Sequence, residues 1–213
     1  MNLQASIRRH LAAVRAMLVF TVILGIAYPL LVTAVGQGLF HDKANGSLLE
    51  NTQGRVIASK VLCQQYVDAE GNALPQYFQA RPSAASDSGN PKDPGCNYAF
   101  SGGSNRGTTD PALKQTIAAR VDAYAKAYGV DPAKVPQDAV TASGSGLDPG
   151  ISVDNADIQA PSVAEARGLD LASVRELVQE NTDGRSLGFL GQEYVNVVTL
   201  NLALDKAAPA AKR

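Results

Sequence analysis

The hydropathy pattern is dominated by one long apolar run near the N-terminus. No charged residue occurs from Ala16 to Phe40, a stretch of 25 positions. As an α-helix this stretch would be about 37 Å long, enough to cross a hydrocarbon core of roughly 30 Å. Pro29 lies within it, but proline is tolerated in membrane helices when neighbouring groups satisfy the freed carbonyl. The pattern predicts a single transmembrane helix over residues 16–40.

The charges that flank this run indicate its orientation. Arg8, Arg9 and Arg15 precede it with no acidic residue among them, whereas both signs of charge follow it. Because positively charged flanks stay on the cytoplasmic side, we expect residues 1–15 to form a cytoplasmic N-terminus. The remainder would then lie on the other side of the membrane, outside the cytoplasm.

A cleaved signal peptide is the alternative interpretation of the same run. Val32-Thr33-Ala34 could serve as a small-residue cleavage site, and both interpretations export the chain that follows. Apolar character continues past this site to Phe40, and it is longer than a signal peptide needs. We therefore favour a retained membrane anchor.

Beyond residue 40 the chain mixes short strand patterns with helix patterns. Two strand-like stretches, 47–49 and 55–62, flank a turn and predict a hairpin. Helices are predicted from Asp110-Pro111 to Gly129, around residues 162–167, and from Asp170 to near Gly184. Residues 81–110 and 141–150 are rich in Gly, Ser, Pro and Asn and predict irregular loops.

The last apolar pattern has a period of two. Val198, Leu200, Leu202 and Leu204 alternate with mostly polar residues, which predicts a strand over 198–205. The alanine-rich segment 206–213 predicts a disordered tail. Helices and hairpins together predict a mixed α+β domain over residues 41–205.

Composition excludes several classes of function. The net charge is −1, with 19 Lys and Arg against 20 Asp and Glu, so nucleic acid is not an expected partner. The only histidines are His10 and His41. A Ser-His-Asp or Cys-His catalytic site, or a zinc site that relies on His, is therefore excluded after position 41. No pair of carboxylates stands out, and no metal site is predicted.

Two short segments rich in Gly and Ser, 101–105 and 141–149, are candidate binding loops. Successive backbone N–H groups in such loops can bind anions, and the first segment resembles the nucleotide-contacting signature of transport ATPases. Neither segment ends in the Lys-Ser/Thr of a phosphate-binding P-loop. We favour the alternative that the glycines permit tight turns where another segment packs closely.

Three further side chains are candidates for specific roles. Arg81 follows two aromatic residues, and it either binds a carboxylate ligand or, as we favour, ties down the loop after it. Cys63 and Cys96 are the only cysteines, and an oxidising compartment favours a disulfide between them. Two buried free thiols are the alternative, because pairing cannot be read from sequence.

Six motifs occur in one order along the chain and together carry a resemblance. They are Tyr28-Pro29-Leu30-Leu31-Val32-Thr33, Ala44-Asn45-Gly46-Ser47-Leu48, Tyr77-Phe78 with Arg81-Pro82-Ser83-Ala84, Ser101-Gly102-Gly103-Ser104-Asn105, residues 140–149, and Val195-Asn196 with residues 200–205. In this order behind one membrane helix, they resemble the C chain of the bacterial Kdp potassium-transporting ATPase. The resemblance covers residues 18–205.

This resemblance implies a non-catalytic accessory subunit. In that family a channel-like A chain carries potassium, and a P-type ATPase B chain binds and hydrolyses ATP. The C chain is needed for assembly and is described as a catalytic chaperone that raises the ATP affinity of the B chain. The resemblance therefore implies no cofactor for this chain itself, since ATP and Mg would be bound by the partner.

A rival hypothesis is a stand-alone, membrane-anchored periplasmic enzyme or solute-binding module. Such a protein needs a deep pocket with convergent polar groups. An accessory subunit instead needs small and polar residues in its membrane helix, where partner helices pack. Thr21, Gly25, Thr33 and Gln37 are the expected contacts with partner helices.

The orientation can be tested with a reporter enzyme that is active only in the periplasm. Because the arginines precede the apolar run, we expect a fusion after Asp205 to be active and the mature chain to retain Met17–Phe40. Intact-mass measurement of the purified chain checks the second point. A mature N-terminus at Val35 would contradict the retained anchor, though not the export of the domain.

Overall fold

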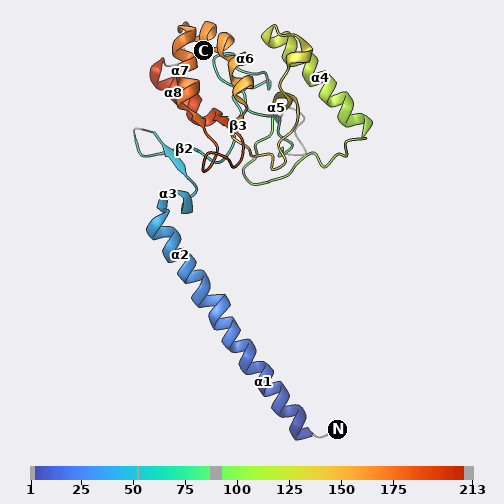
Figure 1. The fold of residues 1–213 in the computed structure, drawn as a ribbon, viewed down its shortest axis with the longest axis vertical. Coiled ribbons are helices and arrows are strands. Elements are labelled where there is room, and N and C mark those ends of the chain that lie inside the picture. Colours follow the sequence, from blue (N-terminus) through green and yellow to red (C-terminus); the bar gives the residue numbers. More distant parts are fainter. Residues whose placement is uncertain (1–2, 52, 87–92, 209–213) are drawn as a thin grey trace. The chain divides into compact units, whose positions relative to one another are not determined.

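The computed structural model describes residues 3–51, 53–86 and 93–208. The chain divides into two compact units, Met1–Ser47 and Leu48–Arg213, which are described separately here. The first unit is helical, and the second is a domain of helices with two small antiparallel sheets (Figure 1). This composition confirms the α+β fold class.

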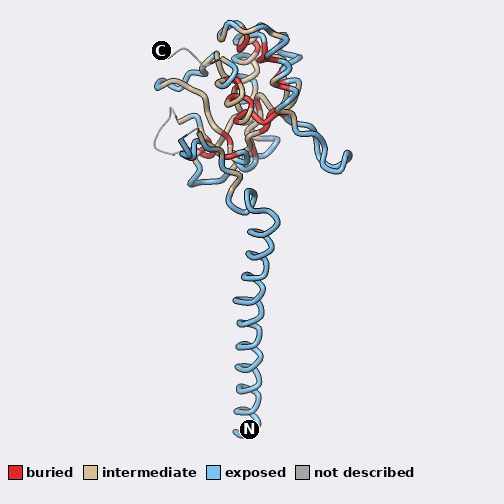
Figure 2. Tube along the Cα trace, turned by 90° about the vertical axis from the view of Figure 1, so that its left-hand side faces the viewer, coloured by how far each residue is buried: buried red, intermediate tan, exposed pale blue. Residues whose placement is uncertain are grey.

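The N-terminal unit is built on one long apolar helix. It consists of α1 (Leu3–Val22), the π-helical turn η1 (Ile23–Ala27) and α2 (Tyr28–Leu39), and a short helix α3 (His41–Ala44) follows. The 37 residues from Leu3 to Leu39 are long and apolar enough to cross a membrane. None of their side chains is buried within the chain (Figure 2). The helix thus begins well before residue 16 and ends one residue before the predicted Phe40.

The π turn lies where the helix accommodates its proline. Pro29 has no N–H to donate to the carbonyl of Gly25, four residues earlier. Just before it, the N–H of Tyr28 bonds to the carbonyl of Ile23, five residues earlier, which widens the turn. The helix therefore continues through Pro29 instead of ending there.

The second unit starts with the predicted hairpin. Strand β1 (Leu48–Glu50) pairs antiparallel with β2 (Val56–Ser59), and Leu48 lies opposite Ser59. From Lys60 to Asp110 the described residues contain no helix or extended strand, in agreement with the predicted loop at 81–110.

Helix α4 (Pro111–Tyr128) has the boundaries that the sequence predicts. The side chain of Asp110 accepts a hydrogen bond from the N–H of Ala112, and Gly129 ends the helix with a φ of +64°. Both signals are local, which is why sequence alone locates them. A 3₁₀ turn, η2 (Pro132–Lys134), and α5 (Gln137–Val140) follow.

The core lies between three helices and a three-stranded sheet. The helices are α6 (Val153–Arg167), α7 (Leu171–Glu180) and α8 (Val197–Ala207), and the sheet has the order β3 (Gly150–Ile151), β5 (Tyr194–Asn196), β4 (Thr182–Asp183). The largest buried apolar side chains include Phe78, Ile151, Val163, Val174, Val195, Leu200 and Leu204. Helix α6 begins nine residues before the predicted position, and α7 ends at Glu180 instead of near Gly184 because β4 follows it.

The predicted strand at 198–205 is wrong, because this segment forms helix α8. The buried residues Val197, Leu200, Asn201 and Leu204 have the spacing of a helix face. Asn196 begins the helix, and its side chain accepts hydrogen bonds from the N–H groups of Val198 and Thr199. The alternation suggested a strand because Asn201 was counted as a solvent-facing residue, whereas it is fully buried.

Asn201 is buried because it completes the hydrogen bonding of an extended segment. Its Oδ1 accepts from the N–H of Phe78 at 2.9 Å, and its Nδ2 donates to the carbonyl of Phe78 at 2.9 Å. Phe78 belongs to no strand, so these two bonds replace a sheet partner. The aromatic side chain of Phe78 is thereby held in the core.

Arg167, at the end of α6, forms hydrogen bonds that connect α6 to the C-terminal end of the domain. Its guanidinium donates to the carbonyl of Gln76 at 2.6 Å, to the carbonyl of Ala208 at 2.7 Å and to Asp205 Oδ1 at 2.8 Å. It also lies over the ring of Tyr77, 4.7 Å from the centroid. Helix α8 includes two residues of the predicted tail, and residues 209–213 lie outside the described residues.

Cys63 and Cys96 are joined by a disulfide in the structure, with their Cα atoms 5.9 Å apart. Both residues are buried. The N–H of Cys96 donates to the hydroxyl of Ser83 at 3.0 Å, so the bridge lies against the segment that follows Arg81. The bridge connects the end of the β1–β2 hairpin to the middle of the long irregular region.

Removal of this bridge should weaken the domain. It spans 33 residues, and in the chain-entropy model a loop of that size contributes about 3–4 kcal/mol. We expect the Cys63→Ala/Cys96→Ala variant to lose about this much unfolding free energy. Urea unfolding of the full chain in mild detergent, followed by tyrosine fluorescence, measures it. Peptide mapping without reductant should find the linked pair, and free thiols in protein from an oxidising compartment would contradict the bridge.

Candidate functional site

The loop between α5 and β3, residues 141–149, is the place where segments that carry several of the sequence motifs come together. Three segments that are distant in sequence each form a backbone hydrogen bond of 2.8–2.9 Å with it. The pairs are Cys63 with Leu147, Pro82 with Ser143, and Gly102 with Ser145. The structure thus brings both Gly/Ser-rich loops, the Arg81 segment and the disulfide together.

Gly146 is required at the centre of this arrangement. Its φ is +71°, and a Cβ at this position would lie 2.6 Å from both the Cβ of Ala85 and the carbonyl oxygen of Gly102. The Gly146 carbonyl accepts from the hydroxyl of Ser83 at 2.7 Å. Close approach of another segment therefore accounts for this glycine, as the favoured interpretation of the sequence expects.

The backbone amides of these loops are engaged within the protein. The N–H of Gly102 donates to the carbonyl of Ser145, and the N–H of Leu147 donates to the Ser145 hydroxyl at 3.1 Å. The N–H of Gly146 donates to the hydroxyl of Ser143 at 3.1 Å. These three amides are not available to a phosphate group, which argues against an anion-binding nest formed by them.

Arg81 stabilises the loop between α5 and β3 through an ion pair with Asp148. Its Nη1 lies 3.0 Å from Asp148 Oδ2, and the other carboxylate oxygen of Asp148 accepts from the N–H of Gly150 at 2.9 Å. The pair is partly exposed, so it contributes by positioning more than by Coulomb energy. Arg81 Nε is buried and has no hydrogen-bond partner among the described residues.

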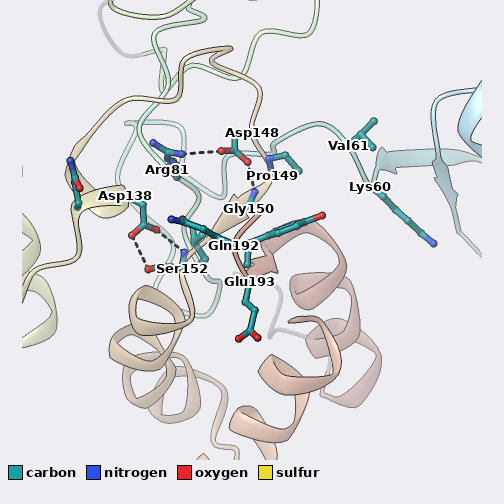
Figure 3. Close-up of a pocket in the computed structure, with 13 residues that line it drawn as sticks. Lys60, Val61, Arg81, Asp138, Asp148, Pro149, Gly150, Ser152, Gln192 and Glu193 are labelled. Atoms are coloured by element: carbon teal, nitrogen blue, oxygen red, sulfur yellow. Dashed lines mark hydrogen bonds and ion pairs between the residues drawn. The ribbon is translucent and has the colours of Figure 1, made fainter. Parts of the chain in front are cut away.

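A cavity of about 540 Å³ lies beside the ion pair (Figure 3). It is bordered by the 148–152 segment, the end of β2 and the start of β5. Charged and hydrogen-bonding side chains of its wall include Lys60, Arg81, Asp138, Asp148, Glu193 and Tyr194. This is the pocket of the described domain in which polar groups of several segments converge.

One carboxylate of this wall, that of Asp138, has several structural partners. Asp138 accepts from the N–H and the hydroxyl of Ser152, both at 2.8 Å, and from Asn155 Nδ2 at 3.0 Å. Burial, followed by the nearby carboxylate of Asp183, raises the pKa of Tyr194, so its phenol is protonated at neutral pH. Asp138 therefore positions Ser152, the residue directly before helix α6, and Tyr194 is not an ionised nucleophile.

Sequence reasoning did not find Asp138 or this cavity. The role of Asp138 depends on Ser152 and Asn155, which lie 14 and 17 residues further along the chain. Ser152 is itself the N-cap of α6, with its hydroxyl accepting from the N–H of Asn155. A serine directly before the helix was the one local signal that could have indicated a cap there.

The expected partner-contact residues lie along the exposed membrane helix. Thr21 and Gly25 are four residues apart, as are Thr33 and Gln37, so the members of each pair are neighbours on the helix surface. A Cβ added to Gly25 would meet only Thr21 Cγ2, at 3.8 Å, which leaves the surface beside Gly25 open. Gln37 differs from the others, because its side-chain amide exchanges two hydrogen bonds, of 3.2 and 3.1 Å, with that of Asn45.

No group of three or more His, Cys, Asp or Glu side chains in the described part of the chain could hold a metal ion. The arrangement around residues 141–150 is a network of hydrogen bonds with one ion pair, Arg81–Asp148.

Comparison with known proteins identifies the family. The family model described as KdpC, K+-transporting ATPase, c chain, matches residues 10–206. The chain belongs to this family. It is 51% identical over 201 residues to the potassium-transporting ATPase KdpC subunit of Mycobacterium tuberculosis (strain H37Rv), covering 93% of this chain and 98% of the relative.

Other relatives carry the same name. The subunits of Sorangium cellulosum and Methylococcus capsulatus are 49% and 47% identical over 191 and 193 residues, which is 90% and 91% of this chain and 94% and 95% of theirs. The resemblance drawn from the six motifs is thereby confirmed. The chain is a subunit of a potassium-transporting ATPase with an accessory role in potassium transport.

Gly144 and Gly146 lie in the loop between α5 and β3, here called the central loop. Replacing each of them with alanine tests the close packing at Gly146. At Gly146 an alanine would combine a positive φ with overlap, so we expect Gly146→Ala to lower the unfolding free energy by about 2–4 kcal/mol. At Gly144 nothing lies within 4 Å of the added Cβ, so Gly144→Ala should stay within about 0.5 kcal/mol of the parent. Urea unfolding of both variants measures the difference, and equal stabilities would contradict the close packing at Gly146.

Proposed function

We propose that this chain is a non-catalytic subunit that assembles a potassium pump through its membrane helix. Its partners would be the channel-like, potassium-translocating A chain and the ATP-hydrolysing P-type B chain of the same complex. The N-terminus would lie in the cytoplasm and the main domain in the periplasm. The observation that carries the proposal is the exposed helix Leu3–Leu39, in a chain that matches such subunits over nearly its whole length.

The composition of the helix supports contact with other helices as well as with lipid. Large apolar side chains such as Leu18, Leu24 and Leu30 suit a lipid environment. Small residues have no such advantage in lipid, but they allow two helix backbones to approach closely. The open surface beside Gly25, next to Thr21, is a position where a partner helix would fit.

The effect on ATP would be indirect. In this proposal ATP and Mg are bound by the B chain, and this chain raises the affinity for ATP by favouring one arrangement of the membrane helices. Three of the loop amides, those of Gly102, Gly146 and Leu147, are bonded to Ser143 and Ser145, which does not favour nucleotide contact through them. Coupling between distant sites of this kind typically amounts to about 1–3 kcal/mol.

A stand-alone enzyme or solute-binding module is the second candidate, and the cavity of about 540 Å³ is the observation that favours it. An enzyme would need a free base or nucleophile in that wall. Asp138 accepts hydrogen bonds from two donors of Ser152 and one of Asn155, and Asp148 is paired with Arg81. The geometry therefore supports the accessory subunit better.

Helix packing can be tested by adding bulk on either side of the helix. Gly25→Leu should reduce co-purification of the two larger chains by about tenfold, or ~1.4 kcal/mol, because it fills the surface beside Thr21. Ala27→Leu adds similar bulk on nearly the opposite side of the helix and is the matched control. Affinity purification in mild detergent and potassium-stimulated ATPase activity measure the effect.

Deletion of the chain should abolish high-affinity potassium uptake in cells. Full-rate transport by the two larger chains reconstituted alone, with unchanged dependence on ATP, would refute the proposed function. Equal effects of Gly25→Leu and Ala27→Leu would refute only the assignment of the contact face.

A further inference from the structure

The exposed apolar side chains of the second unit are concentrated on two hairpins. Among its described residues, only Tyr98 and Phe100 are large, apolar and exposed elsewhere. On or beside β1–β2 these side chains are Leu48, Val56, Ile57 and Val61, and on β4–β5 they are Leu187, Phe189, Leu190 and Tyr194. Such concentrated apolar surface marks contact with a membrane or another protein.

The tip of the β4–β5 hairpin presents its apolar residues outward. Leu187 is 82% exposed and Phe189 is 69% exposed. The tip is closed by a bridge between Ser186 and Leu190, and Leu187 and Gly188 adopt positive φ values of 55° and 81°. This tight turn leaves Leu187 and Phe189 without cover from their own domain.

The two hairpins meet at their bases. Asn196 at the end of β5 donates from Nδ2 to the carbonyl of Lys60 at 2.8 Å, and both hairpins border the cavity of Figure 3. Leu48, the first residue of the domain, lies opposite Ser59 in the β1–β2 pair. The chain therefore enters the domain beside the base of the β4–β5 hairpin.

Covalent geometry limits how far this part of the domain can be from the bilayer. Leu39 ends the membrane helix, and Leu48 follows nine residues later. Even a fully extended chain of that length spans only about 30 Å, and four of the residues are coiled in α3. The linking segment therefore keeps Leu48, at the base of the β1–β2 hairpin, within about 30 Å of the end of the helix.

We propose that the tip of the β4–β5 hairpin, residues 187–190, inserts into the lipid interface of the bilayer. Phenylalanine and leucine suit the boundary between headgroups and acyl chains, and Arg185 and Gln192 beside the tip suit the headgroups. A projecting tip needs no complementary surface in lipid, whereas a protein partner would need a pocket to receive it. This goes beyond the proposed assembly function and requires only that the helix spans the membrane.

The test uses the fact that the chain contains no tryptophan. Phe189→Trp places the sole indole at the tip, and Phe100→Trp is the matched control at an exposed phenylalanine away from both hairpins. The full-length variants are placed in nanodiscs of phosphatidylcholine and phosphatidylglycerol. Brominated acyl chains should quench the indole at 189 about threefold or more relative to that at 100, with emission at shorter wavelength.

Emission typical of water and no quenching at position 189 would overturn the proposal. Leu187→Trp provides a second probe of the tip and should behave like Phe189→Trp. If the indole becomes shielded only when the two larger chains are added, without quenching by brominated lipid, a protein covers the tip and the proposal is wrong. Co-purification of those chains is scored separately, so a failure of insertion is distinguishable from a failure of assembly.

Discussion

The arrangement of the second unit depends on the backbone hydrogen bonds of residues 143–147. The described residues from Lys60 to Asp110 contain no helix or extended strand, so their buried peptide groups must find other partners. The central loop supplies backbone hydrogen-bond partners for the segments around Cys63, Pro82 and Gly102. Gly146 makes this possible because no side chain keeps the segments apart. The cavity and the bases of both hairpins occupy their positions because this loop is fixed.

Much of the fold could be predicted wherever local chemistry decides it. Asp110 and Gly129 set the ends of α4 through caps that involve only neighbouring residues. The C-terminal segment could not be predicted in the same way, because its apolar alternation is compatible with a strand. The burial of Asn201 decides in favour of a helix, and that burial depends on Phe78, which lies 123 residues earlier. Tertiary context thus overrode a local pattern.

The individual residues of the candidate site could be predicted from the sequence, but their proximity in the folded chain could not. The sequence indicated Arg81, both Gly/Ser-rich loops and the two cysteines, and it favoured a structural role for Arg81. That these segments meet is a property of the three-dimensional chain path, which spacing does not encode. Asp138 was missed because nothing local distinguishes it from the other carboxylates. Asn45, which follows α3, was likewise missed as the group that engages Gln37 of the N-terminal helix.

The position of Arg167 limits how the C-terminus of this protein can be shortened. Chain ends can usually be trimmed, because few of their backbone groups are buried or bonded. Here the guanidinium is almost fully buried, at 1% exposure, and one of its acceptors is the carbonyl of Ala208. Truncation before Ala208 would leave a buried cation short of an acceptor. The boundary of any shortened version must therefore lie after Ala208.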